Sequence, residues 1–134
     1  MSIKKLFLVI ILFFVSTSSY SASMNMIGEK GDPSKIDRTI EIEMYDNYYY
    51  PTQIEVKKGE TIKFIVKNLG ELVHEYNIGT KEMHIKHQPE MAKLVEHEIL
   101  LADKIDHEKM KKMSKMDHSL GHSHANSVLL EPNE

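Results

Sequence analysis

The sequence contains no cysteine and no tryptophan, and its only arginine is Arg38. Without cysteine, no disulfide can stabilise the fold and no thiolate can serve as a nucleophile or a metal ligand. The mildly acidic, well-mixed charges form no basic stripe, so nucleic acid is not an expected partner. The sequence also lacks a glycine-rich phosphate loop, a G-x-S-x-G motif and an H-E-x-x-H motif, and Glu71 with Glu75 is interpreted as a solvated charge pair. We therefore do not expect an enzyme.

One apolar run, LFLVIILFFV at residues 6–15, follows Lys4 and Lys5 and precedes the small, polar stretch STSSYSAS. This order is typical of a secretory signal peptide, which we place at residues 1–22. The run is shorter than the roughly twenty residues that a membrane-spanning helix needs, so no stable span is expected after cleavage, with an uncut signal anchor as the alternative. The mature protein is therefore predicted to be exported, and the preference for lysine over arginine favours a bacterial periplasm.

The rest of the chain is short enough for one domain. Residues 23–38 are polar and rich in turn formers, and we expect a flexible segment there. Beyond it, Ile40, Ile42 and Met44 alternate with glutamates, which is the period of a half-buried strand. Similar short alternating segments occur at residues 54–56, 62–67 and 73–78. Their spacing and the polar turns between them predict a mainly β protein with an antiparallel sandwich.

Residues 81–126 have a different, helical character. Pro89 is expected in the first turn of the main helix, where its missing N–H costs nothing. Met91 and Leu94 then lie on one face, so core packing is favoured over metal binding for Met91. A second amphipathic helix is expected within residues 107–116, and the final SVLLEPNE predicts the start of another strand.

All eight histidines lie in the second half of the chain, interleaved with methionines. Imidazole combined with thioether is a ligand set that suits copper. The strongest local signal is H-S-L-G-H-S-H, in which His118, His122 and His124 can fold around Cu(II), Zn(II) or Ni(II). The sequence does not choose among these metals, and a merely polar loop is the alternative. His84 and His87 lie one helical turn apart, and for them an ordinary role without metal is favoured.

The stretch H-E-K-M-K-K-M-S-K-M places His107, Met110, Met113 and Met116 at every third position. On an α-helix each such step rotates about 60° short of a full turn. Neighbours in the series can therefore meet, but the two ends lie on opposite sides. The repeat supports two-ligand pairs, or a strip that wraps around an ion, rather than one preformed four-ligand site. Because lysines alternate with the methionines, the apolar side of a surface helix explains the repeat equally well.

The segment YYYPTQIEVKKGETIKFIVKN and the HEYNIGT that follows shortly after resemble the cupredoxin family, most closely the small exported cupredoxin-like proteins of bacterial copper handling. In that family the pattern P-x-x-I-x-V-x-x-G-x-x-I-x-F-x-V-x-N precedes the first copper-ligating histidine. The resemblance implies a partial Greek-key cupredoxin-like β-sandwich over residues 39–134, with residues 81–126 as a helical His/Met-rich insertion. It also implies copper as the bound ion and His74 as its inherited ligand. The matching positions are Pro51, Ile54, Val56, Gly59, Ile62, Phe64, Val66 and Asn68.

The chain departs from the family in its remaining ligands. These are a cysteine, a second histidine and usually a methionine, on a hairpin near the C-terminus that this sequence does not contain. A copper–thiolate bond therefore cannot form, and we expect a sandwich that is truncated at its C-terminus. Copper on His74 must then be shared with the His/Met-rich insertion or be bound weakly.

The resulting hypothesis is a periplasmic copper-binding protein that serves copper tolerance or delivers copper to a periplasmic transfer or redox partner. One alternative is an electron-transfer blue copper protein, if the sequence is a truncated form of a longer chain. Another is a His-rich zinc- or nickel-binding module. The candidate metal ligands are His74, His107, Met110, Met113, His118, His122 and His124.

Overall fold

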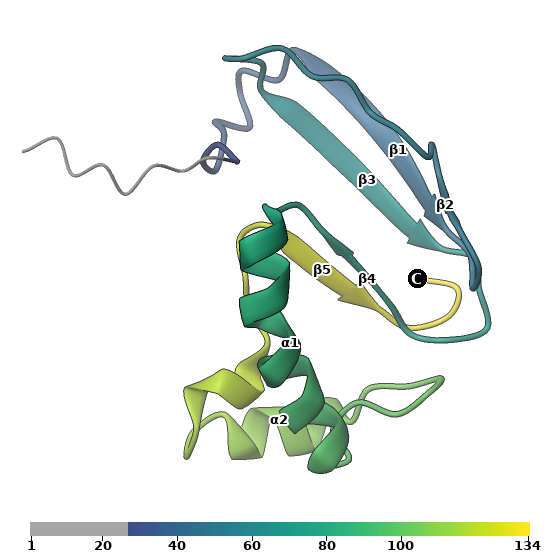
Figure 1. The fold of residues 1–134 in the computed structure, drawn as a ribbon, viewed down its shortest axis with the longest axis vertical. Helices are drawn as coiled ribbons and strands as arrows, with labels where there is room; N and C mark the ends of the chain where they lie inside the picture. The colour runs from purple at the N-terminus through teal and green to yellow at the C-terminus, as the bar shows by residue number, and fades with distance from the viewer. Residues whose placement is uncertain (1–26) are drawn as a thin grey trace, which may run out of the picture.

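A computed structural model describes residues 27–134 (Figure 1). The predicted signal peptide at residues 1–22, and residues 23–26 of the segment expected to be flexible, lie outside the described residues. One sheet has the strand order β2-β1-β3, and a second pairs β4 with β5. The elements in chain order are β1 (Arg38–Met44), β2 (Tyr49–Tyr50), β3 (Ile62–Asn68), β4 (His74–Asn77), α1 (Lys81–Glu96), α2 (His107–Met113), the 3-10 helix η1 (His118–Gly121) and β5 (Ser127–Leu130).

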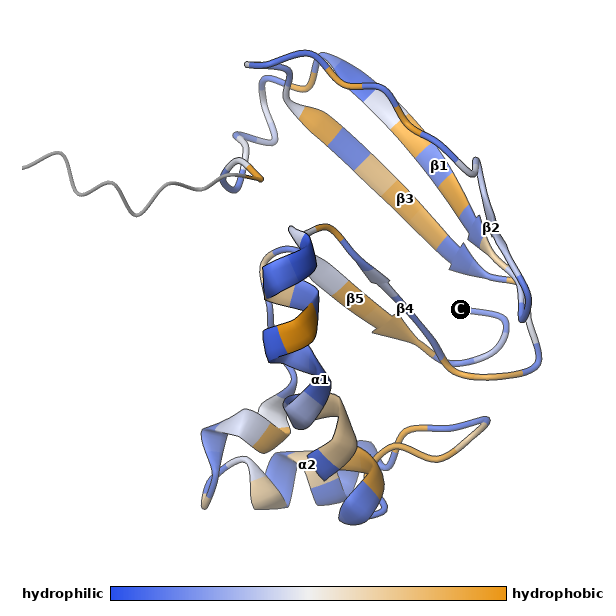
Figure 2. Cartoon of the chain, in the orientation of Figure 1, coloured by the Kyte–Doolittle hydropathy of each residue, from blue (hydrophilic) through white to orange (hydrophobic). Residues whose placement is uncertain are grey.

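The first sheet follows the alternation in the sequence. Ile42 and Met44 of β1 are buried whereas Glu41 is exposed, and Figure 2 shows polar and apolar residues alternating along β1 and β3. The expectation of an antiparallel sandwich is wrong for this pair, because β1 and β3 run parallel, with Ile42 beside Val66. β2 and residues 51–61 carry the chain back to the level where β1 begins, so β3 starts again in the same direction.

The alternating piece at residues 54–56 does not form the expected strand. Within the described residues, this part of the chain pairs with β1 only through Tyr49 and Tyr50. Pro51 follows directly and has no N–H to donate to a ladder. Val56 is consequently left 58% exposed.

Asn68, at the end of β3, joins the two sheets. Its side chain is fully buried, and its Nδ2 atom donates to the carbonyl oxygens of Leu72 (2.8 Å) and Leu130 (3.0 Å). Because a buried amide without partners would be costly, these bonds hold the turn after β3 and the end of β5 in place. The rings of Phe64 and Tyr76, 5.9 Å apart, add an apolar contact between β3 and β4.

Helix α1 begins two turns before Pro89, so the expectation that Pro89 lies in its first turn is wrong. Thr80 caps the helix, and its Oγ1 accepts a hydrogen bond from the backbone N–H of Met83 (3.2 Å). Pro89 inside the helix removes one backbone hydrogen bond. The helix continues beyond it because Leu94 in the following turn is fully buried.

A small apolar core holds the helical segment together. Leu94, Ile99 and Leu120 are buried against one another, and Met110 and Met113 pack onto them. The predicted second helix is thus confirmed as α2. Figure 1 shows the helices gathered at the β4–β5 pair, away from β1 and β3.

The mainly β architecture with a helical insertion is confirmed, because the helices all lie between β4 and β5 in the chain. The strand predicted in SVLLEPNE is confirmed as β5, which pairs antiparallel with β4. This pairing brings both ends of the insertion to one place. No helix within residues 27–134 is long and apolar enough to cross a membrane.

Candidate metal centre

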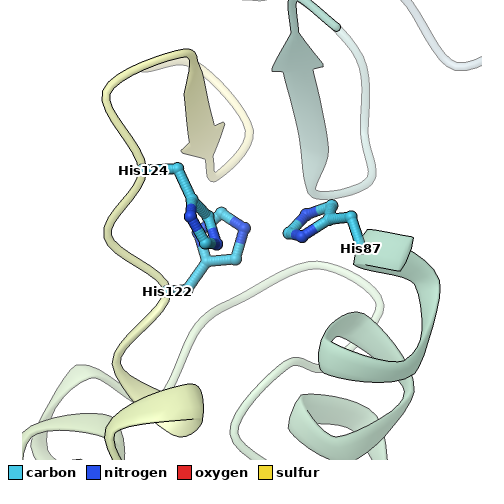
Figure 3. A group of neighbouring side chains, drawn as sticks. All are labelled: His87, His122 and His124. Carbon is cyan, nitrogen blue, oxygen red and sulfur yellow. The ribbon is translucent and has the colours of Figure 1, made fainter. Parts of the chain in front are cut away.

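Three imidazoles from two separate parts of the chain meet beside β4. One ligand nitrogen from each of His87, His122 and His124 lies within 4.8 Å of the others. The ring centroids are 5.0 to 5.3 Å apart, and Figure 3 shows His122 and His124 facing His87. Imidazoles at this separation can bind one metal ion with little movement. We call these three residues the histidine cluster.

The apolar core of the helical segment positions the histidine cluster. His87 lies on α1, and further along the same helix Leu94 packs against Leu120. Leu120 belongs to η1, which ends immediately before His122. His122 has a left-handed backbone (φ 37°, ψ 66°), which residues other than glycine rarely adopt, and this turns the chain after η1. The packing that holds η1 on α1 therefore also brings His122 and His124 to His87.

Glu75 of β4 lies against two of the imidazoles. Its Oε1 atom is 3.0 Å from Nε2 of His87 and 3.2 Å from Nε2 of His122. The side chain of Glu75 is 16% exposed and that of His122 is 5% exposed, so this part of the site is shielded from solvent. Carboxylate oxygen combines with imidazole in protein metal sites, so Glu75 is placed to act as a further ligand.

Glu90 lies on the other side of the histidine cluster. Its Oε2 atom is 3.0 Å from Nδ1 of His87 and 3.1 Å from Nε2 of His124. A neutral imidazole carries one N–H, so His87 can donate to both carboxylates only as the protonated imidazolium. A metal ion on Nε2 would take the place of one proton, while Nδ1–H could still donate to Glu90. Such a carboxylate fixes the tautomer and the orientation of a ligating imidazole.

The Glu75 carboxyl is held in its ionised form. Burial raises its pKa, but hydrogen bonding to His122, the nearby Ser127 hydroxyl and the charge of His87 outweigh burial and lower the pKa to about 2. The buried Ser127 Oγ makes no hydrogen bond of normal geometry within the described residues, so we attribute the shift mainly to the histidines. The site therefore contains a stable negative charge with a buried hydroxyl close to it.

A cavity of about 290 Å³ lies next to the histidine cluster. His122 and His124 line it together with Ser127, and α2 contributes His107 and Met110. A water molecule occupies about 30 Å³ in the liquid, so a hydrated ion fits in this space. The cavity gives an ion a route to the ring nitrogens.

His74, predicted as the inherited copper ligand, lies apart from the histidine cluster. Its Nε2 atom is 2.9 Å from Oδ1 of Asp46, and its ring meets Tyr49 edge-on. The hydrogen bonds from His74 and from the backbone N–H of Glu71 lower the pKa of Asp46, which keeps an anion beside this histidine. Successive side chains of a strand point to opposite faces, so His74 and Glu75 face opposite sides of β4.

Of the other predicted histidines, the structure brings together His122 and His124. His118 is exposed at the start of η1. His107 is also exposed, and its Nε2 atom lies 3.4 Å from Oε1 of Glu131. Neither ring belongs to the group of converging ligand atoms.

The predicted methionine ligands point to the core of the helical segment. Met110 and Met113 both pack against Leu94 and its neighbours, and Met110 also lines the cavity. Met116, at the end of the repeat, is 76% exposed. This arrangement agrees with the alternative that the repeat forms the apolar side of a helix.

Sequence reasoning missed three residues of the site. The sequence favours an ordinary role for His87 and a solvated one for Glu75, and it makes no prediction for Glu90. The spacing of His87 and Glu90, one helical turn apart, was an available signal. Glu75 offered none, because its imidazole partners lie 12 and 47 residues away along the chain.

The chain belongs to the cupredoxin-like domain family, which it matches over residues 5–103. This match confirms the family resemblance found in the sequence and the cupredoxin-like fold class. No solved structure matches the chain.

Three similar proteins each carry the name Copper-resistant cuproprotein CopI. The protein of Pseudomonas aeruginosa is 36% identical over 136 aligned residues, which cover 91% of this chain and 71% of that protein. The protein of Rubrivivax gelatinosus is 37% identical over 65 residues, which cover 48% of this chain and 39% of that protein. The protein of Vibrio cholerae is 24% identical over 121 residues, which cover 72% of each.

The residues of this chain do not fit a blue copper centre by themselves. Such a centre requires a thiolate ligand, and the 134 residues contain no cysteine. His74 is the position that matches the family's first ligand, and its ring contacts Asp46. Among the histidine and acidic side chains of residues 27–134, the histidine cluster is the group that is arranged to hold a metal ion.

Proposed function

We propose that this chain is an exported copper-binding protein that serves copper tolerance, and that the histidine cluster holds the ion. The convergence of His87, His122 and His124 within 4.8 Å, in a member of the cupredoxin-like family, carries the proposal. The names of three similar proteins support copper as the metal. At a given nitrogen and oxygen site, Cu(II) generally binds more tightly than Ni(II) or Zn(II).

The construction of the site suits an ion that is exchanged rather than kept. The ring nitrogens are already paired with Glu75 and Glu90, so the imidazoles remain satisfied when the ion leaves and protons return. The side chain of His124 is 35% exposed, which leaves one side of the site open to a competing ligand. These features support temporary binding of copper and its delivery to a partner protein.

Export to the periplasm is part of the proposal and depends on the signal peptide predicted at residues 1–22. Cell fractionation tests it: the protein should be recovered from the periplasm and should lack its first residues by mass spectrometry. Recovery from the cytoplasm with an intact N-terminus would contradict export.

The test of copper binding is a titration of the purified protein with Cu(II) against a competing chelator. His87→Ala should weaken binding by roughly tenfold or more, because it removes one of three ligands. His84→Ala is the matched control, since His84 is an exposed histidine one turn earlier on α1 and should leave the affinity unchanged. Equal affinities for the two variants would rule out the histidine cluster as the site.

Zinc is the second candidate, because three imidazoles with a carboxylate also suit Zn(II). Native mass spectrometry of the protein mixed with equal amounts of Cu(II), Zn(II) and Ni(II) separates the alternatives. We expect one copper ion per chain. A zinc-loaded or nickel-loaded protein under these conditions would replace copper by that metal in the proposal.

A further inference from the structure

The histidine cluster is enclosed by two carboxylates. Glu75 and Glu90 both contact its ring nitrogens, at 3.0 to 3.2 Å. The side chain of Glu75 is shielded, at 16% exposed, whereas that of Glu90 is 36% exposed and lies on the open side of the site with His124. Two acidic side chains at this position favour an ion with a higher positive charge.

We propose that Glu75 is a fourth metal ligand and that, together with Glu90, it makes the histidine cluster a site for Cu(II) rather than for Cu(I). This inference rests on the proposed function, because it presupposes that copper binds at these three histidines.

The position of Glu75 supports its role as a ligand. Its Oε1 atom is within 3.2 Å of the Nε2 atoms of both His87 and His122. An ion bound by these two nitrogens would replace protons that now bridge them to the carboxylate, and it would lie beside the same oxygen. The buried Ser127 hydroxyl supplies a hydrogen-bonding group next to this carboxylate.

The charges of the site favour a divalent ion. Three neutral imidazoles with two carboxylates carry a charge of −2, which Cu(II) neutralises and Cu(I) leaves at −1. The side chains of His87, His122 and Glu75 are only 13%, 5% and 16% exposed, so water screens little of an uncompensated charge on the side of the site that Glu75 forms. A buried charge without a partner is energetically unfavourable, so the remaining negative charge destabilises the Cu(I) form of the site.

The donor atoms favour the same oxidation state. Thioether and thiolate sulfur select Cu(I), whereas imidazole serves both states and carboxylate oxygen suits harder ions. Two methionines near these ligands, Met91 directly after Glu90 and Met110 in the lining of the neighbouring cavity, both pack onto the apolar core. The ring nitrogens themselves contact oxygen.

The experiment compares the purified protein with its Glu75→Gln variant, which keeps the shape of the side chain and removes its charge. Affinity for Cu(II) is measured against a Cu(II) chelator, and affinity for Cu(I) against a Cu(I) chelator under anaerobic reduction. We expect Glu75→Gln to weaken Cu(II) binding by roughly tenfold to a hundredfold and to change Cu(I) binding by less than about threefold. Glu71→Gln, at an exposed glutamate four residues earlier, is the matched control and should change neither.

The outcomes separate this inference from the proposed function. If neither form of copper binds more tightly to the wild-type protein than to His87→Ala, the proposed function fails. If copper binds at the histidine cluster but Glu75→Gln weakens both forms equally, or neither form, the function stands and this inference fails. Should Glu75→Gln not fold, as judged by circular dichroism, the wild-type protein decides: reduction by ascorbate should release the copper to a Cu(I) chelator, and retention would overturn the inference.

Discussion

His74 and Glu75 are neighbours in β4, and their side chains lie on opposite faces of that strand. His74 contacts Asp46 at 2.9 Å, whereas Glu75 contacts His87 at 3.0 Å. The two-residue period of a strand makes this separation unavoidable. The position that matches the family's copper ligand and the carboxylate of the histidine cluster therefore belong to two distinct environments.

This separation predicts that His74→Ala leaves Cu(II) binding at the histidine cluster nearly unchanged. Residues that share no partners contribute independently, so the affinity should stay within about twofold of wild type in a chelator competition. A loss as large as that caused by His87→Ala would show that copper is shared between His74 and the insertion.

The packing of the methionines gives a prediction that distinguishes core residues from ligands. Met110→Leu and Met113→Leu preserve apolar volume against Leu94 but remove the thioether. The free energy of unfolding should change by less than about 1.5 kcal/mol, and Cu(II) affinity should not change. A marked loss of affinity in either variant, with stability retained, would identify that methionine as a ligand.

Leu94 is predicted to be critical for both stability and metal binding, since it holds η1 on α1. Leu94→Ala should reduce the free energy of unfolding by about 2–5 kcal/mol in urea titrations, because it leaves a cavity in a small core. The adjacent Val95, which is 57% exposed, provides the control, and Val95→Ala should cost much less. Similar losses for the two variants would contradict the packing described for the helical segment.

The low pKa of Glu75 makes the stability of the metal-free protein depend on pH. Its pKa is 4.5 in the unfolded chain and about 2 in the folded protein, so the unfolded chain takes up a proton first as the pH falls. The stabilisation is complete above pH 4.5 and is lost between pH 4.5 and 2. Because Glu75 is partly exposed, we expect a loss of ~1–2 kcal/mol.

Urea unfolding at several pH values between about 6 and about 1.5 measures this effect (~4.5 pH units, wide enough to span the shift). Glu75→Gln should show a shallower decline than wild type, whereas Glu71→Gln should follow the wild-type curve. Parallel curves for wild type and Glu75→Gln would mean that the paired state of Glu75 does not contribute to stability.

The strand pattern was readable from the sequence because burial repeats at fixed intervals. The alternation of Ile42 and Met44 with glutamates was enough to predict β1, and the family pattern up to Asn68 indicated the fold. The parallel pairing of β1 with β3 was not readable, since alternation gives the face of a strand but not its partner. The start of α1 was predicted wrongly from Pro89, because proline favours the first turn of a helix. The cap at Thr80 and the burial of Leu94 override this local preference.

The site was only half predictable for a similar reason. His122 and His124 lie two residues apart, so their grouping was visible in the sequence. His87 and Glu75 join them only because the insertion folds back on α1 and β4, a long-range contact that no local spacing records. The residue types of the site could be predicted from their metal-binding chemistry, but tertiary packing determines which of these residues meet.

X-ray absorption spectroscopy of the protein loaded with one equivalent of Cu(II) tests the central claim most directly, since it counts imidazole and sulfur ligands. The histidine cluster predicts three imidazoles with oxygen and no sulfur in the wild-type protein, and two imidazoles in His87→Ala. His84→Ala should give the wild-type spectrum. A thioether in the ligand set, or an unchanged number of imidazoles in His87→Ala, would contradict the assignment of copper to His87, His122 and His124.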